Sequence, residues 1–199
     1  MVKHAFRLRL MKENPLDFVE KKVKGKAKKK DVLTLAELQT LAATNTESKE
    51  VRRAFLLSCV TGLRWCDIVT LTWKSIDLNN KLINLRQSKT AEDLCTPLND
   101  TAIALLGESG DEDDLVFILP TANGANKTVK AWVKRAGISK AITWHNARHS
   151  FGTNLIFNEV GLLTTSQLMG LTSVKHSQRY VNTAREMKEK ATNLINFKV

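Results

Sequence analysis

The stretch Thr143–Tyr180 reads TWHNARHSFGTNLIFNEVGLLTTSQLMGLTSVKHSQRY, and the rest of the chain is best interpreted from it. It holds a His-x-x-Arg-His cluster, then apolar residues at helical spacing, then Tyr180, the only tyrosine of the chain. Two shorter stretches lie upstream, TGLR at 61–64 and QSKT at 87–90. Two arginines, a lysine, a histidine and a tyrosine in this order indicate phosphoryl transfer to a tyrosine.

Composition limits the classes of protein that fit. With 199 residues, 43% of them hydrophobic, the chain is long enough for one large domain, alone or with a short appendage. The net charge of +11 favours a polyanionic partner: DNA, RNA or an anionic membrane surface. The membrane is disfavoured, because no apolar run approaches the length of a spanning helix and no stretch resembles a signal peptide.

The three cysteines, Cys59, Cys66 and Cys95, show no metal-ligand spacing. Cys59 and Cys66 lie in apolar helical surroundings and are expected to be small core residues in a reducing compartment. We therefore expect a cytoplasmic protein.

Residues 1–33 are predicted to form an entry segment and basic linker, followed by a compact domain at 34–199. The run KKVKGKAKKK at 21–30 is expected to be solvated and extended, because its like charges repel one another. Lys28, Lys29 and Lys30 are candidates for DNA phosphate contacts that do not depend on base sequence. A chain that starts in this way also suggests a further domain on its N-terminal side.

Local patterns predict a mostly helical domain with a small sheet. A capping box at Thr34–Glu37 starts a helix that is expected to bury Leu35, Leu38, Leu41 and Ala42. A second helix is expected from residue 47 or 48 to a left-handed Gly62. Further helices are predicted at 66–71, from an Asp100 cap to 106, at 126–136, in the block after 143 and at 184–197. Strands are predicted near 73–77, 81–85 and 94–98, with Lys89 near the tip of a hairpin.

Arg64 and Arg148 are candidates for binding a phosphodiester. Each guanidinium is a planar, permanently charged fork that matches two phosphate oxygens, and a pair of them stabilises a pentacoordinate phosphorus without a metal. A single arginine after a helix end is more often solvated or capping. Asp67 favours a phosphate-binding role for Arg64, because it lies one helical turn away and can hold the Arg64 side chain in place.

Tyr180 is the candidate nucleophile. A phenol has a pKa of about 10, so it needs positive charge or a base nearby to attack phosphorus. Lys175, His176 and Arg179 supply that setting, and Lys175 and Arg179 are also candidate DNA contacts. An ordinary half-buried tyrosine is the commoner case for tyrosines in general.

Lys89 and His145 are candidates for proton transfer. A lysine at a hairpin tip can enter a minor groove and protonate a leaving 5′ oxygen, although an exposed turn lysine is the commoner case. His145 can exchange a proton or hydrogen-bond a phosphate oxygen. The pair His145 and His149 leaves a zinc site as a weak alternative, since no third ligand is in view.

The order of these motifs resembles the catalytic domain of the tyrosine recombinase, or phage-type integrase, family over roughly residues 34–197. The resemblance implies an α+β fold that is mostly helical with a small antiparallel three-stranded sheet. It also implies site-specific recombination through a covalent 3′-phosphotyrosyl DNA intermediate, without a metal or cofactor, as in integration or excision of a mobile element. The matching stretches are Thr61–Arg64 with Asp67, Gln87–Thr90, His145–His149, Leu168–Leu171 and Arg179–Tyr180.

The family resemblance further implies double-stranded DNA as partner, a tetramer on DNA and an N-terminal core-binding domain. Leu171 departs from the pattern, because members usually carry His or Trp there and leucine donates no hydrogen bond; His176 is a possible substitute. Two alternatives stay open: a DNA-binding protein with reduced or lost strand transfer, and a relaxase similar to type IB topoisomerases. The predicted helix at 184–197 packs on its own domain or on a neighbouring subunit.

Overall fold

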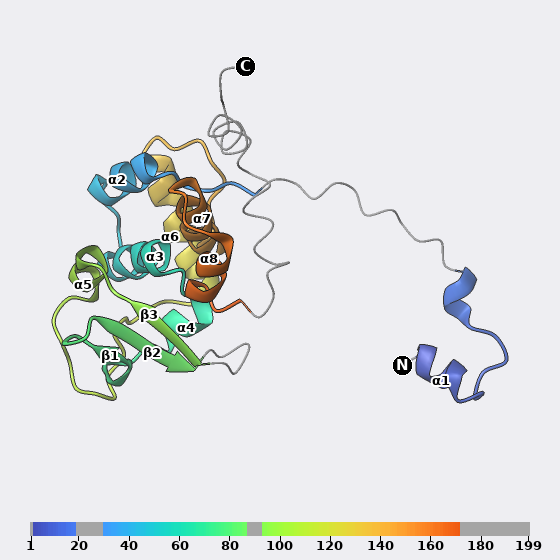
Figure 1. Ribbon diagram of the computed structural model, residues 1–199. Coiled ribbons are helices and arrows are strands. Elements are labelled where there is room, and N and C mark those ends of the chain that lie inside the picture. Colours follow the sequence, from blue (N-terminus) through green and yellow to red (C-terminus); the bar gives the residue numbers. More distant parts are fainter. Residues whose placement is uncertain (1, 19–29, 87–92, 172–199) are drawn as a thin grey trace, which may run out of the picture. The chain divides into compact units, whose positions relative to one another are not determined.

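The computed structural model describes residues 2–18, 30–86 and 93–171, and the chain divides into two units, Met1–Lys30 and Asp31–Val199 (Figure 1). In the first unit, α1 spans Val2–Arg7 and the 3-10 helix η1 spans Pro15–Phe18. The second unit begins at Asp31, close to the boundary predicted at 34. Among the residues described, no helix combines the length and the apolar character needed to cross a membrane.

The second unit is built around helix α3. This helix is buried on most of its surface, and it packs against α5, α6 and α7. A helix that is apolar on so many sides belongs in the centre of a domain. The described helices of this unit are α2 (Leu35–Ala43), α3 (Lys49–Thr61), α4 (Trp65–Val69), α5 (Asp100–Leu106), α6 (Ala122–Arg135), α7 (Trp144–Phe157) and α8 (Leu162–Leu168).

The helix ends follow the local chemistry of the sequence. The predicted capping box is present: Thr34 Oγ1 accepts from the Glu37 amide at 3.2 Å, and the Thr34 amide donates to Glu37 Oε2 at 2.8 Å. Ser48 caps α3, and Gly62 ends it with φ 73°. The expected burial of Leu35 is wrong, because its side chain is 53% exposed. Leu35 is the first residue of α2, where Cβ tilts back over the cap and away from the core.

Three antiparallel strands form the sheet in the order β1-β2-β3, as predicted. They are β1 (Ile76–Asp77), β2 (Leu82–Arg86) and β3 (Asp93–Pro97), with Leu85 opposite Leu94 and Arg86 opposite Asp93. The predicted first strand at 73–77 is too long. Trp73–Ser75 is a 3-10 helix, because the amides of its first two residues bond to the carbonyls of the 112–114 loop.

Further boundaries differ from prediction, and one of them is the start of the helix predicted from 126, which is α6 and begins at Ala122. Asn99, and not Asp100, caps α5, with its Oδ1 accepting from the Ala102 amide at 2.8 Å. The predicted helix at 66–71 is shorter, ending at Val69, and Leu71 follows it as a buried residue. These are shifts of a few residues at element ends. Inside α2, Leu41 is buried as expected, whereas Leu38 and Ala42 are half-buried and pack against the core.

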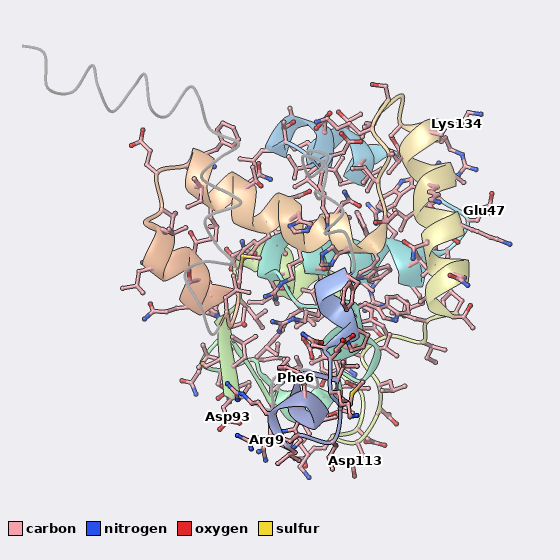
Figure 2. All side chains as sticks on the ribbon, turned by 90° about the vertical axis from the view of Figure 1, so that its right-hand side faces the viewer. Phe6, Arg9, Glu47, Asp93, Asp113 and Lys134 are labelled. Carbon is pink, nitrogen blue, oxygen red and sulfur yellow. The ribbon has the colours of Figure 1, made fainter. Side chains whose placement is uncertain are left out.

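The sheet lies at one end of the helical part, with α4 between the two (Figure 1). Helix α8 lies beside β3. Asp93 is the first residue of β3, and it lies on the other side of the picture from Glu47 and Lys134 (Figure 2). The described ends of the hairpin, Arg86 and Asp93, thus lie on the side of the sheet that α8 adjoins. Lys89 itself lies outside the described residues.

Candidate functional site

Arg148 and Arg64 approach the same turn from different elements. Arg148, on α7, is only 5% exposed, and it donates from Nη1 to the Gly62 carbonyl at 2.6 Å and from Nη2 to the Met169 carbonyl. Arg64 precedes α4 and donates from Nη2 to the Gly170 carbonyl at 3.3 Å. Residues far apart in the sequence therefore bring two guanidinium groups to the Met169–Gly170 turn.

Helix ends explain why both arginines are stable there. The last carbonyls of a helix lack partners within the helix and form the negative end of its dipole. Gly62 follows α3, and the Met169–Gly170 turn follows α8. The guanidinium groups donate to carbonyls that have no partner within their own helix. They thus place permanent positive charge where the C-terminal ends of α3 and α8 meet α7.

Gly62 is required by both its backbone and its surroundings. Its φ of 73° lies in the left-handed region, and a Cβ there would lie 2.4 Å from Cδ1 of Phe151. Its carbonyl in turn receives Arg148. The TGLR stretch therefore has two roles. Gly62 turns the chain and its carbonyl accepts from Arg148, and Arg64 supplies the second guanidinium group.

Asp67 lies next to Arg64, as the spacing predicted. The carboxylate is 3% exposed, and its Oδ2 is 3.9 Å from Arg64 Nη1. The neighbouring Cys66 donates from Sγ to Asp67 Oδ1 at 3.7 Å. Burial, and secondly the negative charge of Asp67, raise the pKa of the Cys66 thiol. Cys66 is thus a neutral, partly buried thiol, and Cys59 is fully in the core.

The two histidines of the cluster differ in exposure. His145 is exposed on the first turn of α7, whereas His149 is 5% exposed. Their rings meet edge to face with centroids 4.4 Å apart. Within the described ranges, no group of three or more His, Cys, Asp or Glu side chains is arranged to hold a metal ion. His145 therefore lies at the surface, three residues before Arg148 on the same helix.

Leu171 follows the turn that receives both arginines. Its amide donates to the Ser166 carbonyl at 3.0 Å, and its side chain packs on the small apolar cluster of Ile156 and Met169. The residue that departs from the family pattern is thus next to Gly170, the acceptor of Arg64.

Several predicted residues lie outside the described ranges. These are Lys28, Lys29, Lys89, Lys175, His176, Arg179 and Tyr180, and the predicted helix at 184–197 lies there too. Lys30 is described and exposed. The structure therefore brings together Arg64, Asp67, Arg148 and the Leu171 position, with His145 on the same helix as Arg148.

Sequence reasoning missed the aromatic contacts that join the two arginine stretches. Trp65 follows Arg64, Trp144 precedes His145, and their ring centroids are 4.5 Å apart. Trp144 also meets Phe55 of α3 edge to face at 5.6 Å. The available signal was that Trp65 directly follows Arg64 and Trp144 directly precedes His145 in the sequence.

Comparisons with known proteins identify relatives of this chain. A "Tyrosine recombinase" of Thermosipho africanus is 29% identical over 187 residues, which cover 88% of this chain and 65% of that protein. The integrase of Salmonella phage P22 is 29% identical over 143 residues, covering 62% of this chain and 37% of that protein. The chain thus spans less than two thirds of the length of these curated relatives.

Solved structures share the fold. The crystal structure of XerA recombinase aligns with a TM-score of 0.71 at 21% identity, covering 89% of this chain and 68% of that one. The Tn1549 transposon integrase in complex with transposon right end DNA gives 0.73 at 19% identity, covering 94% and 76%. The α+β fold with a small three-stranded sheet is therefore confirmed. The model of the phage integrase family matches residues 31–187, and the chain belongs to this family of tyrosine recombinases.

Proposed function

We propose that the chain is the catalytic part of a site-specific recombinase that cuts and rejoins double-stranded DNA through a covalent 3′-phosphotyrosyl intermediate. One observation carries the proposal: Arg64 and Arg148 converge on the Met169–Gly170 turn, ten positions ahead of Tyr180 in the sequence. Two buried or half-buried arginines at one point are suited to a phosphodiester, which presents two non-bridging oxygens.

The proposed cleavage step exchanges one phosphate ester for another. The Tyr180 oxygen attacks phosphorus and forms the new P–O bond, while the bond to the 5′ oxygen breaks. Lys89 gives its proton to that leaving oxygen, and the phenol proton passes to a base or to solvent. Arg64 and Arg148 stabilise the charge that builds on the non-bridging oxygens, Asp67 holds Arg64, and His145 hydrogen-bonds the phosphate.

Rejoining is the reverse reaction with another DNA end. A free 5′ hydroxyl attacks the phosphotyrosine, the P–O bond to Tyr180 breaks, and Lys89 accepts the proton. The number of phosphodiester bonds is unchanged over the cycle, so no nucleotide cofactor is needed. Leu171 supplies no hydrogen bond to the phosphate, and His176 is the proposed substitute.

The proposed partner is double-stranded DNA, bound by a tetramer in the cytoplasm. The charge of +11 suits the phosphate backbone, with Lys28, Lys29, Lys30, Lys175 and Arg179 as proposed contacts. The Tn1549 integrase was solved with DNA, which supports this partner. The proposal also includes an N-terminal core-binding domain, which binds the other face of the duplex.

Trapping of the covalent adduct tests the proposal. The full chain is incubated with a pool of randomised duplexes, each nicked so that cleavage releases a short fragment and prevents rejoining. DNA that stays bound to protein after denaturation is then sequenced. We expect an adduct with the wild type and none with Tyr180→Phe, at equal DNA affinity.

Each other outcome counts against the proposal in a defined way. DNA binding without an adduct would favour a binding protein that lacks strand transfer. Adducts without sequence preference, together with relaxation of supercoiled plasmid, would favour a topoisomerase-like relaxase. An adduct that persists in Tyr180→Phe would exclude Tyr180 as nucleophile.

A further inference from the structure

Helix α7 carries a row of polar side chains on one face, formed by Asn146, Ser150 and Asn154. Their spacing of four residues places them one above another along the helix. Asn146 and Ser150 are buried, and Asn154 is half-buried. Polar groups at such depth need hydrogen-bond partners. Ser150 Oγ donates to the Asn146 carbonyl and Asn146 Oδ1 accepts from Thr143 at the helix start, and each of the three side chains also has a partner outside the helix.

The extended segment Asp31–Leu33 supplies those partners. Asn146 Nδ2 donates to the Asp31 carbonyl at 2.7 Å, the Leu33 amide donates to Ser150 Oγ at 2.8 Å, and Asn154 Nδ2 donates to the Leu33 carbonyl at 3.0 Å. Three successive rungs of one helix thus hold a segment that is more than a hundred residues away in the sequence.

Further contacts fix the same segment. Lys140 Nζ donates to the Val32 carbonyl at 2.8 Å, and the Ala141 amide donates to Asp31 Oδ2 at 2.9 Å. The side chain of Leu33 is fully buried in the core. Each carbonyl from Asp31 to Leu33 therefore accepts from a side chain, so the segment is specifically bound and does not behave as a loose connection.

The opposite face of α7 carries Arg148. With 3.6 residues per turn, Arg148 is rotated by about 200° from Asn146 around the helix axis. The helix is therefore held on one side by the 31–33 segment, and on the other side Arg148 bonds to the Gly62 and Met169 carbonyls. A rotation or sliding of α7 that breaks the first set of contacts displaces the second.

We infer that Asn146, Ser150 and Asn154 are positioning residues, which set Arg148 and His145 for strand cleavage by binding the Asp31–Leu33 segment. The inference rests on the proposed function.

Asn154→Ala tests the inference, with Asn158→Ala as the matched control. Asn154 is half-buried, so its truncation leaves the core intact while removing the donor to Leu33. Asn158 directly follows α7 as its C-cap, and its exposed side-chain amide donates to the Asn154 carbonyl at 2.8 Å. The two variants therefore lose the same chemical group, and only one of them loses contact with the segment.

The first measurement is amide hydrogen exchange of α7 and of residues 31–34 in the full chain without DNA. We expect about fivefold faster exchange of both peptides in Asn154→Ala, the effect of one typical hydrogen bond, and little change in Asn158→Ala. Equal exchange in the two variants would overturn the inference, and this result does not depend on whether the protein cleaves DNA.

The second measurement is the single-turnover rate of adduct formation on nicked DNA, alongside DNA affinity. We expect Asn154→Ala to slow adduct formation about fivefold at unchanged affinity, and Asn154→Gln, which keeps an amide donor on a longer arm, to restore part of the rate. An unchanged rate in an active protein would overturn the positioning role. A wild type that forms no adduct would instead count against the proposed function, and hydrogen exchange alone would then decide whether the segment and α7 are coupled.

Discussion

Trp65 and Trp144 lie edge to face, with ring centroids 4.5 Å apart and planes at 77°. One follows Arg64 and the other precedes His145, so their contact joins the two stretches that carry the proposed phosphate-binding arginines. Trp144 is 4% exposed and also meets Phe55 of the central helix. Apolar packing next to Arg64 and next to His145 therefore holds the two stretches at a fixed separation.

Truncation of Trp144 is expected to destabilise the domain strongly. Trp144→Ala should cost about 3–5 kcal/mol in the free energy of unfolding, as for other large-to-small changes in a core. Trp144→Phe should cost much less, because it keeps an aromatic ring against Trp65. It also removes an indole N–H that has no hydrogen-bond partner among the described residues. Urea unfolding of both variants measures this, and equal losses would contradict the proposed role of the ring.

Gly62→Ala is expected to disturb stability and cleavage together. A non-glycine residue in the left-handed region costs about 1–3 kcal/mol, and here the added Cβ also collides with Phe151. Gly137→Ala is the matched control, because Gly137 has φ 71° and no atom within 4 Å of an added Cβ. Urea midpoints should fall further for Gly62→Ala than for Gly137→Ala. Equal shifts would mean that Phe151 moves aside without cost.

Acid is expected to weaken the contact between α2 and the Lys140 region. Partial burial acts to raise the pKa of Glu37, but Lys140 and Thr34 outweigh it, so that the pKa of this carboxyl lies below its usual range. A lowered folded pKa means that the carboxylate contributes stability above its unfolded pKa, about 4.3, and that this contribution is lost as the pH falls through the folded pKa.

Glu37→Gln tests this pH dependence. The wild type should be more stable than the variant at pH 7, and the difference in the free energy of unfolding should shrink as the solution becomes acidic. Glu47→Gln is the control, because the Glu47 carboxylate is 75% exposed in its ion pair with Arg135. A difference that stays constant from neutral to acidic pH would show that the Glu37 charge is not responsible.

Leu171→His is expected to raise the rate of adduct formation. Leu171 directly follows Gly170, whose carbonyl accepts from Arg64, so we expect an imidazole at position 171 to donate to the proposed phosphate. A hydrogen bond to a charged group contributes about 1.5–3 kcal/mol, which corresponds to roughly 10- to 100-fold in rate. Leu162→His, in the same apolar cluster, controls for the loss of packing. A rate that does not rise, at unchanged DNA affinity, would mean that another donor already serves the phosphate.

Adduct formation is expected to persist in excess EDTA. The reason is the arginine pair, which places permanent positive charge where a metal ion would otherwise stabilise the phosphorane. The measurement is trapping on nicked DNA with and without chelator. Loss of the adduct that magnesium restores would require a different mechanism.

The fold was predictable where its causes are local. Thr34, Ser48 and Gly62 terminate helices through side-chain hydrogen bonds or a left-handed backbone, and both kinds of signal act within four residues. The apolar spacing of α3 and of Val129, Trp132 and Val133 in α6 also places the core correctly. The burial of Leu35 was mispredicted because apolar periodicity does not show where a helix begins. Leu35 is the first residue of α2, and its side chain points back past the helix start into solvent.

The candidate site was predictable in its residues but not in its construction. Motif order brought Arg64 and Arg148 together in the prediction. Their acceptors are the backbone carbonyls of Gly62, Met169 and Gly170. Every residue has a backbone carbonyl, so the sequence does not indicate which carbonyls accept from an arginine. The binding of Asp31–Leu33 to α7 was missed for a related reason, since the segment looks like part of a basic linker and its partners are over a hundred residues away.

In the proposed function, the carbonyls that hold Arg64 and Arg148 also affect the entropy of binding a phosphodiester. A free arginine side chain samples many rotamers, and fixing one costs up to about 2 kcal/mol. In this domain that cost is met during folding, because helix ends select the rotamers before any phosphate arrives. A phosphodiester that enters the site meets side chains with little freedom left to lose, so more of the electrostatic attraction remains as net affinity.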